Sequence, residues 1–159
     1  MFKRMLVPID GSHSSSAVVP YAAQLAQRLA CRVDLLLVEP PSGATLPYPE
    51  RRREQPKKRD SEAGALVVGS KTPAHVREAN ERYVARHVEE FAAIGVAASG
   101  QVVCGDIVDE ILRAALDLRS DVVAMSTRKL ASFDRRETGS IAEEVMWRSR
   151  LPVLMVAQG

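Results

Sequence analysis

Five short apolar segments separated by helical patterns constrain the fold of this chain more than any other feature of its sequence. The segments are residues 3–8, 32–38, 96–104, 121–125 and 152–156. Strands that alternate with helices are joined by right-handed crossovers, which make the sheet parallel and place helices on both of its faces. The pattern predicts a single domain over residues 1–159, an α/β fold with a doubly wound, five-stranded parallel sheet of the Rossmann-like kind.

The first predicted helix follows a turn at residues 10–12. Pro20 lies inside its pattern and lacks a backbone N–H, so we expect either a kink there or a helix that begins close to it. The apolar face of this helix consists of Val18, Ala22, Leu25, Ala26 and Leu29.

Three further helices are predicted downstream. Thr72 is expected to cap the first of them and Pro73 to be its first residue, and the helix should end before Gly95. Its apolar stripe consists of Val76, Val84, Val88 and Phe91. Gly105 and Asp106 predict a turn and cap before a helix that buries Ile107, Ile111, Leu112 and Ala115. The last helix is expected over residues 139–147.

Residues 40–71 differ in character from the rest, with five prolines and two basic runs, and they predict an exposed, flexible connection. The basic stretch 51–59 contains Glu54 and has no interleaved aromatic residues, which favours a solvated loop over a nucleic-acid surface. Net charge is only +2 and aromatic residues make up 4% of the chain, so no partner is indicated by composition.

The remaining global signals indicate a cytoplasmic protein with no membrane span. The apolar run from Met5 to Ile9 is broken by Asp10 and is too short for a signal peptide. Cys31 and Cys104 form neither a disulfide framework nor a ligand cluster, and the three histidines lack metal-binding spacing. No metal site is expected.

Ligands of doubly wound sheets bind beyond the carboxyl ends of the strands, where the strand order reverses. The loops at 8–13, 38–42, 104–106 and 126–140 are therefore the places for a site. They contain no dinucleotide fingerprint, phosphate-binding loop or nucleophile elbow. Common enzyme motifs are absent from them.

These loops do carry a set of motifs that together resemble the universal stress protein family. The motifs are Val-Pro-Ile-Asp-Gly-Ser at 7–12, Gly-Asp at 105–106, Asp-Val-Val-Ala-Met at 121–125, Gly-Ser-Ile-Ala-Glu-Glu-Val at 139–145 and Pro-Val-Leu-Met-Val at 152–156. The resemblance implies an adenine nucleotide alpha hydrolase-like fold, a nucleotide crevice between the first and fourth strands, and a homodimer built on residues 152–156, with Trp147 adding contact area.

Nucleotide-binding members of the family carry G-x2-G-x9-G-[ST] after the fourth strand. Here Ser126 and Lys129 occupy the positions of the first two glycines, while Gly139 and Ser140 match the end of the motif. Side chains at the first two positions block close approach of the backbone to phosphate, whereas Arg128 and Lys129 supply positive charge.

The other implied contacts are with the base and the sugar. Pro8 and Val38 would flank the base, although strand-end residues also serve simple packing. Asp10 would accept hydrogen bonds from adenine or ribose, or would serve as a turn residue or helix cap. The complete candidate set is Pro8, Asp10, Val38, Met125, Ser126, Arg128, Lys129, Gly139, Ser140 and Ile141.

Two hypotheses about function follow. In the first, the protein is a stress-response protein that binds ATP or AMP weakly, with Mg²⁺ accompanying ATP, and any hydrolysis is slow and incidental. In the second, it is a dimer of the same family that acts as an interaction or signalling module without nucleotide. No catalytic residue is assigned in either case.

Overall fold

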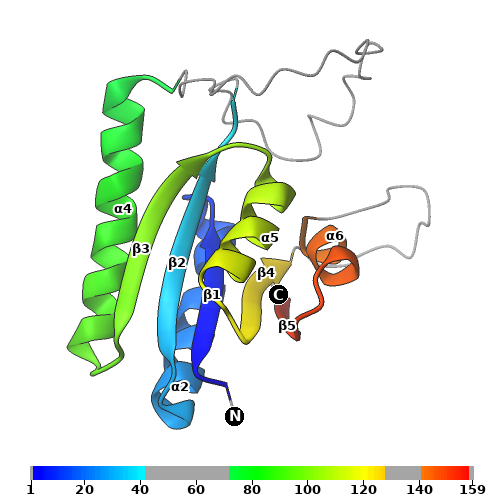
Figure 1. The fold of residues 1–159 in the computed structure, drawn as a ribbon. Helices are drawn as coiled ribbons and strands as arrows, with labels where there is room; N and C mark the ends of the chain where they lie inside the picture. Colours follow the sequence, from blue (N-terminus) through cyan, green and yellow to red (C-terminus); the bar gives the residue numbers. More distant parts are fainter. Residues whose placement is uncertain (1, 42–71, 128–140, 158–159) are drawn as a thin grey trace.

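The computed structural model describes residues 2–41, 72–127 and 141–157, and these form the predicted five-stranded parallel sheet (Figure 1). The strand order is β3-β2-β1-β4-β5, and every neighbouring pair is parallel. The strands are β1 (Arg4–Ile9), β2 (Arg32–Glu39), β3 (Ala98–Cys104), β4 (Val122–Thr127) and β5 (Val153–Ala157). The helices are α1 (His13–Ser16), α2 (Val18–Leu29), α4 (Ala74–Ala93), α5 (Ile107–Asp117) and α6 (Ile141–Arg148).

The two faces of the sheet are covered by different helices, as the doubly wound prediction requires. Met5 and Val7 of β1 pack in one cluster with residues of α2 and α4, whereas Leu6 packs in the other cluster with residues of α5 and α6. Alternate residues of a strand point to opposite faces, so one buried strand contributes to both clusters. The same rule assigns every strand residue discussed below to a face.

The helix boundaries agree with the sequence at α2 and differ at α4. α2 begins at Val18, which places Pro20 in the first turn, where its missing N–H removes no intrahelical hydrogen bond. The N-cap of α4 is Pro73, with φ −54° and ψ 140°, so the prediction of Thr72 as the cap was wrong by one residue. α4 ends before Gly95, which has the positive φ of 78° expected for a helix-ending glycine.

The α5 prediction was correct at its cap and partly correct at its buried face. The Asp106 carboxylate accepts hydrogen bonds from the N–H groups of Val108 (3.0 Å) and Asp109 (3.1 Å). Of the four residues expected to be buried, Ile111 and Ala115 are buried, and the others are half-buried. No described helix combines the length and hydropathy needed to cross a membrane. The predicted connection lies almost entirely in residues 42–71, outside the described ranges.

Asp34 is the one charged side chain inside the apolar run that predicts β2. Its exposed fraction is only 2%. Arg4 donates to both carboxylate oxygens, and Ser99 Oγ donates to Oδ1 at 2.6 Å. The Nη2 atom of Arg32 lies 3.4 Å from Oδ1. A carboxylate can remain charged in a core when it is paired in this way.

Candidate functional site

The sheet opens between β1 and β4 at the carboxyl ends of these strands. β1 pairs with β2 along its whole length, up to the pair Ile9 and Leu37. With β4, by contrast, β1 pairs only at Met5 with Val122 and at Leu6 with Val123. The two strands continue beyond these pairs without a ladder between them.

Pro8 gives the physical reason for the end of this ladder. Arg32 N–H donates to the Lys3 carbonyl, so odd-numbered residues of β1 direct their backbone groups to β2 and even-numbered ones direct theirs to β4. Asp121 N–H accordingly donates to the Arg4 carbonyl at 2.8 Å. Pro8 is the next residue facing β4 after Leu6, and it has no N–H to donate.

The end of the β1–β4 ladder coincides with the point where the strand order reverses. From β1 the chain runs outward through β2 to β3, then returns to the other side of β1 for β4 and β5 (Figure 1). The helices that follow β1 and β4 in the described part of the chain, α2 and α6, accordingly cover opposite faces of the sheet. This is the position at which open α/β sheets bind their ligands.

Four of the candidate residues line one face of this edge. Pro8, Val38 and Met125 are buried and, by the alternation of their strands, lie on the face covered by α5 and α6. Ile141, the first residue of α6, is half-buried and packs against the same cluster. Ser126 points to the other face and pairs with Val156 of β5.

Asp10 follows β1 directly and organises the turn into α1. Its carboxylate accepts a hydrogen bond from Ser12 N–H at 2.8 Å, and its own N–H donates to Ser15 Oγ at 3.0 Å. Ser12 Oγ in turn accepts from Ser15 N–H at 3.0 Å, so Ser12 caps α1. Gly11 has a φ of 81°, which a side chain would strain. Asp10 thus serves as a turn residue, and its side chain is exposed just after the carboxyl end of β1.

Tyr83 of α4 lies close to this turn. Burial raises the pKa of its hydroxyl, and the negative charge of Asp10 acts in the same direction. The phenol is therefore neutral at ordinary pH. It is a packing partner of the turn that the sequence did not single out.

Glu39, the last residue of β2, is a second residue that sequence reasoning missed. It is only 2% exposed. Its carboxylate accepts a hydrogen bond from Asn80 Nδ2 at 3.0 Å and lies 3.5 Å from Arg77 Nη1. The sequence does contain a signal for this residue, because Glu39 is an acidic residue directly after an apolar strand and before a proline. Glu39 therefore joins the first half of α4 to the carboxyl end of β2.

The phosphate side of the candidate set lies outside the described residues, since Arg128, Lys129, Gly139 and Ser140 fall within 128–140. Within the described ranges no group of three histidine, cysteine or acidic side chains could hold a metal ion. Among the described candidates, Pro8, Val38 and Met125 are buried apolar residues and Asp10 supplies an exposed carboxylate.

Comparison with known proteins assigns the chain to a family. The model of the universal stress protein family matches residues 1–157. No curated protein matches the sequence. Among solved structures, a universal stress family protein from Burkholderia pseudomallei is 21% identical, with a TM-score of 0.65 over 98% of this chain and 96% of that one.

Two other similar solved structures are nucleotide complexes. A universal stress protein in complex with cAMP is 18% identical, with a TM-score of 0.68 over 98% of this chain and 97% of that one. A universal stress protein from Archaeoglobus fulgidus in complex with dAMP is 13% identical, with a TM-score of 0.63 over 97% of each chain. At these identities the similarity establishes the fold.

Proposed function

The chain belongs to the universal stress protein family, and we propose that it binds an adenine nucleotide in the crevice between β1 and β4. The observation that carries this proposal is the end of the β1–β4 ladder at Leu6 and Val123, directly before Pro8. Family members that hold cAMP and dAMP support the choice of ligand class.

The proposed binding mode follows from the chemistry at the crevice. The base lies against the apolar floor of Pro8, Val38 and Met125, where a planar ring loses contact with water at little polar cost. Asp10, exposed next to this floor, accepts hydrogen bonds from the sugar hydroxyls or the adenine amino group.

The phosphates are proposed to lie towards residues 126–141. Arg128 and Lys129 supply charge, and the segment from Gly139 and Ser140 into α6 at Ile141 supplies N–H groups of a helix start. The ligand is ATP or AMP, with Mg²⁺ accompanying ATP, and we assign no catalytic residue. Hydrolysis is at most slow and incidental.

We further propose that the protein is a cytoplasmic homodimer of one-domain subunits, paired through β5. Val123 N–H donates to the Pro152 carbonyl, so even-numbered residues of β5 face β4 and the backbone groups of Val153, Met155 and Ala157 face outward. Met155 is 39% exposed and Trp147 on α6 is 81% exposed. An apolar strand edge with a large aromatic nearby suits a second copy of the chain.

Calorimetric titration with ATP and with AMP tests the nucleotide site. Asp10→Asn keeps the oxygen that accepts from Ser12 N–H but removes the charge, and it should weaken binding by about tenfold through loss of a charge-assisted hydrogen bond. The matched control is Asp106→Asn, since the Asp106 carboxylate also accepts backbone N–H groups just after a strand, but that strand is β3, two strands from β1.

Equal weakening by both variants would contradict the placement of the ligand beside Asp10. Absence of binding by the unmodified protein would contradict the proposal itself and favour the dimeric interaction module, for which the exposed β5 edge with Trp147 is the supporting observation.

A further inference from the structure

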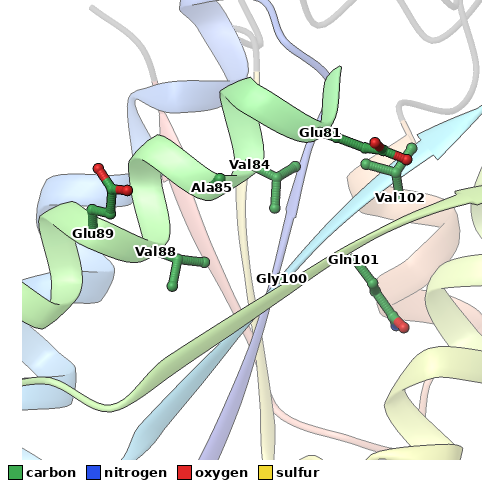
Figure 2. Close-up of a pocket in the computed structure, with 8 residues that line it drawn as sticks. All are labelled: Glu81, Val84, Ala85, Val88, Glu89, Gly100, Gln101 and Val102. Carbon is green, nitrogen blue, oxygen red and sulfur yellow. The ribbon is translucent and has the colours of Figure 1, made fainter. Parts of the chain in front are cut away.

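A groove runs between α4 and β3 on the side of the sheet farthest from β5, and Figure 2 shows the residues around it. Its volume is about 370 Å³, and it is open to solvent. Val84 and Val88 of α4 form one wall, and Gly100 and Val102 of β3 form the other. Glu81 and Glu89 lie at opposite ends, along the exposed side of the helix.

The β3 side of this groove consists largely of backbone. Val33 N–H donates to the Ala97 carbonyl and Gly105 N–H donates to the Glu39 carbonyl, so odd-numbered residues of β3 direct their backbone groups to β2. By alternation, the backbone groups of Ala98, Gly100 and Val102 face outward. No strand in the described part of the chain pairs with this edge.

Gly100 makes this backbone accessible at the middle of the groove. It has no side chain that could cover its own N–H and C=O groups. Val84 and Val88 of α4 lie against the side on which a Cβ atom would stand. The Val102 carbonyl already accepts a long hydrogen bond, 3.5 Å, from Arg77 Nη2. The edge can therefore accept donors from outside the sheet.

The charges around the groove are uneven. At the Val102 end, Arg77 pairs with Glu81 at 3.2 Å and compensates its charge. At the other end, Glu89 lies in the last part of α4, and the last turn of that helix has no basic residue. A helix C-terminus carries a partial negative charge, which adds to the charge of Glu89. This end of the groove is suited to a cation.

We propose that this groove binds an extended segment of another protein, which adds a sixth strand beside β3. Its small apolar side chains pack against the half-buried Val88, its backbone pairs with Gly100 and Val102, and a lysine or arginine lies next to Glu89. Strand addition to an exposed edge combines backbone hydrogen bonds with side-chain selectivity in this manner. The inference does not depend on nucleotide binding.

A second copy of this chain fits the groove less well. Pairing of two β3 strands about a two-fold axis would set the two α4 helices side by side, with Glu81 and Glu89 of one copy facing the same carboxylates of the other. Like charges in that arrangement oppose association. A partner segment with a basic residue at one end would instead be attracted by the carboxylate of Glu89.

The test uses a fluorescein-labelled peptide of about eight residues in which Val and Thr alternate after one Lys, because strands of this length are typical. Fluorescence anisotropy should show saturable binding below about 1 mM. A peptide with Glu in place of Lys should bind at least about threefold more weakly, and one with alternate N-methylated amides at least about tenfold more weakly.

Protein variants locate the binding site. Glu89→Lys should weaken binding of the Lys peptide about threefold, whereas Asp117→Lys makes the same charge change at an exposed position of α5, on the other face of the sheet, and should leave binding unchanged. Val102→Pro removes one outward N–H and should abolish binding, with circular dichroism confirming that the variant is folded.

Several results would overturn the proposal. These are no binding at about 1 mM, equal affinity for the N-methylated peptide, or equal effects of Glu89→Lys and Asp117→Lys. A fall in the oligomeric state of Val102→Pro by sedimentation would also overturn it, since the edge would then be occupied by a second copy.

Discussion

Gly100 lies directly against Val84: a Cβ atom on the glycine would come within 2.3 Å of Val84 Cγ1. It would also lie 3.1 Å from Val88 Cγ2. The close approach of α4 to β3 thus depends on a missing side chain rather than on a special backbone angle. Any larger residue at position 100 requires the side chain of Val84 or the helix itself to shift.

The first prediction concerns this contact. Gly100→Ala should lower the free energy of unfolding by about 1–3 kcal/mol, the usual cost of overpacking a filled site. Urea denaturation measures the loss. Val84→Ala removes the atom that would clash, so the double variant should lose less than the sum of the two single variants, and strict additivity would show that the clash is relieved elsewhere.

The second prediction concerns the buried carboxylate in β2. Asp34→Ala leaves the guanidinium of Arg4 without its partner, and since Arg4 is 28% exposed we expect a loss of about 2 kcal/mol, below the range for fully buried pairs. Ser99→Ala removes one hydrogen bond and should cost about 1 kcal/mol. Urea denaturation measures the free energy of unfolding of both variants. A larger loss for Ser99→Ala than for Asp34→Ala would contradict this prediction.

The third prediction concerns stability in acid. The Asp121 carboxylate accepts hydrogen bonds from the N–H groups of Lys3 (2.7 Å) and Arg4 (2.9 Å), which hold its pKa below the ordinary value. A lowered folded pKa means that its contribution is complete above the unfolded pKa and is lost as pH falls through the folded pKa.

Asp121→Asn should therefore flatten the decline of the urea midpoint below about pH 4, while Asp117→Asn, at an exposed position, should leave the decline unchanged. Midpoints measured between neutral pH and about pH 3 make the comparison. An unchanged slope in Asp121→Asn would remove Asp121 from the account of acid sensitivity.

The fourth prediction concerns the dimer. Met155→Lys places a charge on the exposed centre of β5, and it should shift sedimentation towards monomer at micromolar concentration, with Trp147→Ala giving a smaller shift. Leu116→Lys, at a residue 77% exposed on α5, is the control. A monomeric unmodified protein would contradict the dimer altogether.

The fifth prediction concerns the altered glycine motif. Ser126→Gly combined with Lys129→Gly restores the family spacing, and it should strengthen ATP binding because the backbone can approach the phosphates. Binding by the unmodified protein should weaken with added salt, since side-chain charges are screened. Calorimetry at two salt concentrations checks both points, and tight, salt-insensitive binding before the change would refute them.

The parts of the fold that depend on local pattern were predictable, and those that depend on distant partners were not. Apolar runs located all five strands to within two residues, because a strand buried on both faces needs such a run. The burial of Asp34 could not be read, since its partners Arg4 and Ser99 lie about 30 and 65 positions away along the chain.

The candidate site shows the same division. The positions of Pro8 and Met125 on one face follow from strand alternation, which the sequence already contains. The roles of Glu39 and Tyr83 depend on where α4 packs against the sheet, and a helix that follows a long connection has no register that a local pattern could reveal. Tertiary packing decides such contacts.

The proline that ends the β1–β4 ladder bears on how a ligand would enter. Where a ladder must fray before a site opens, association waits for a rare open state and its rate levels off at high ligand concentration. Here the missing donor is built into the covalent chain, so no hydrogen bond from position 8 to β4 has to break before a ligand binds. Nucleotide association should then rise in proportion to concentration, as a simple encounter does.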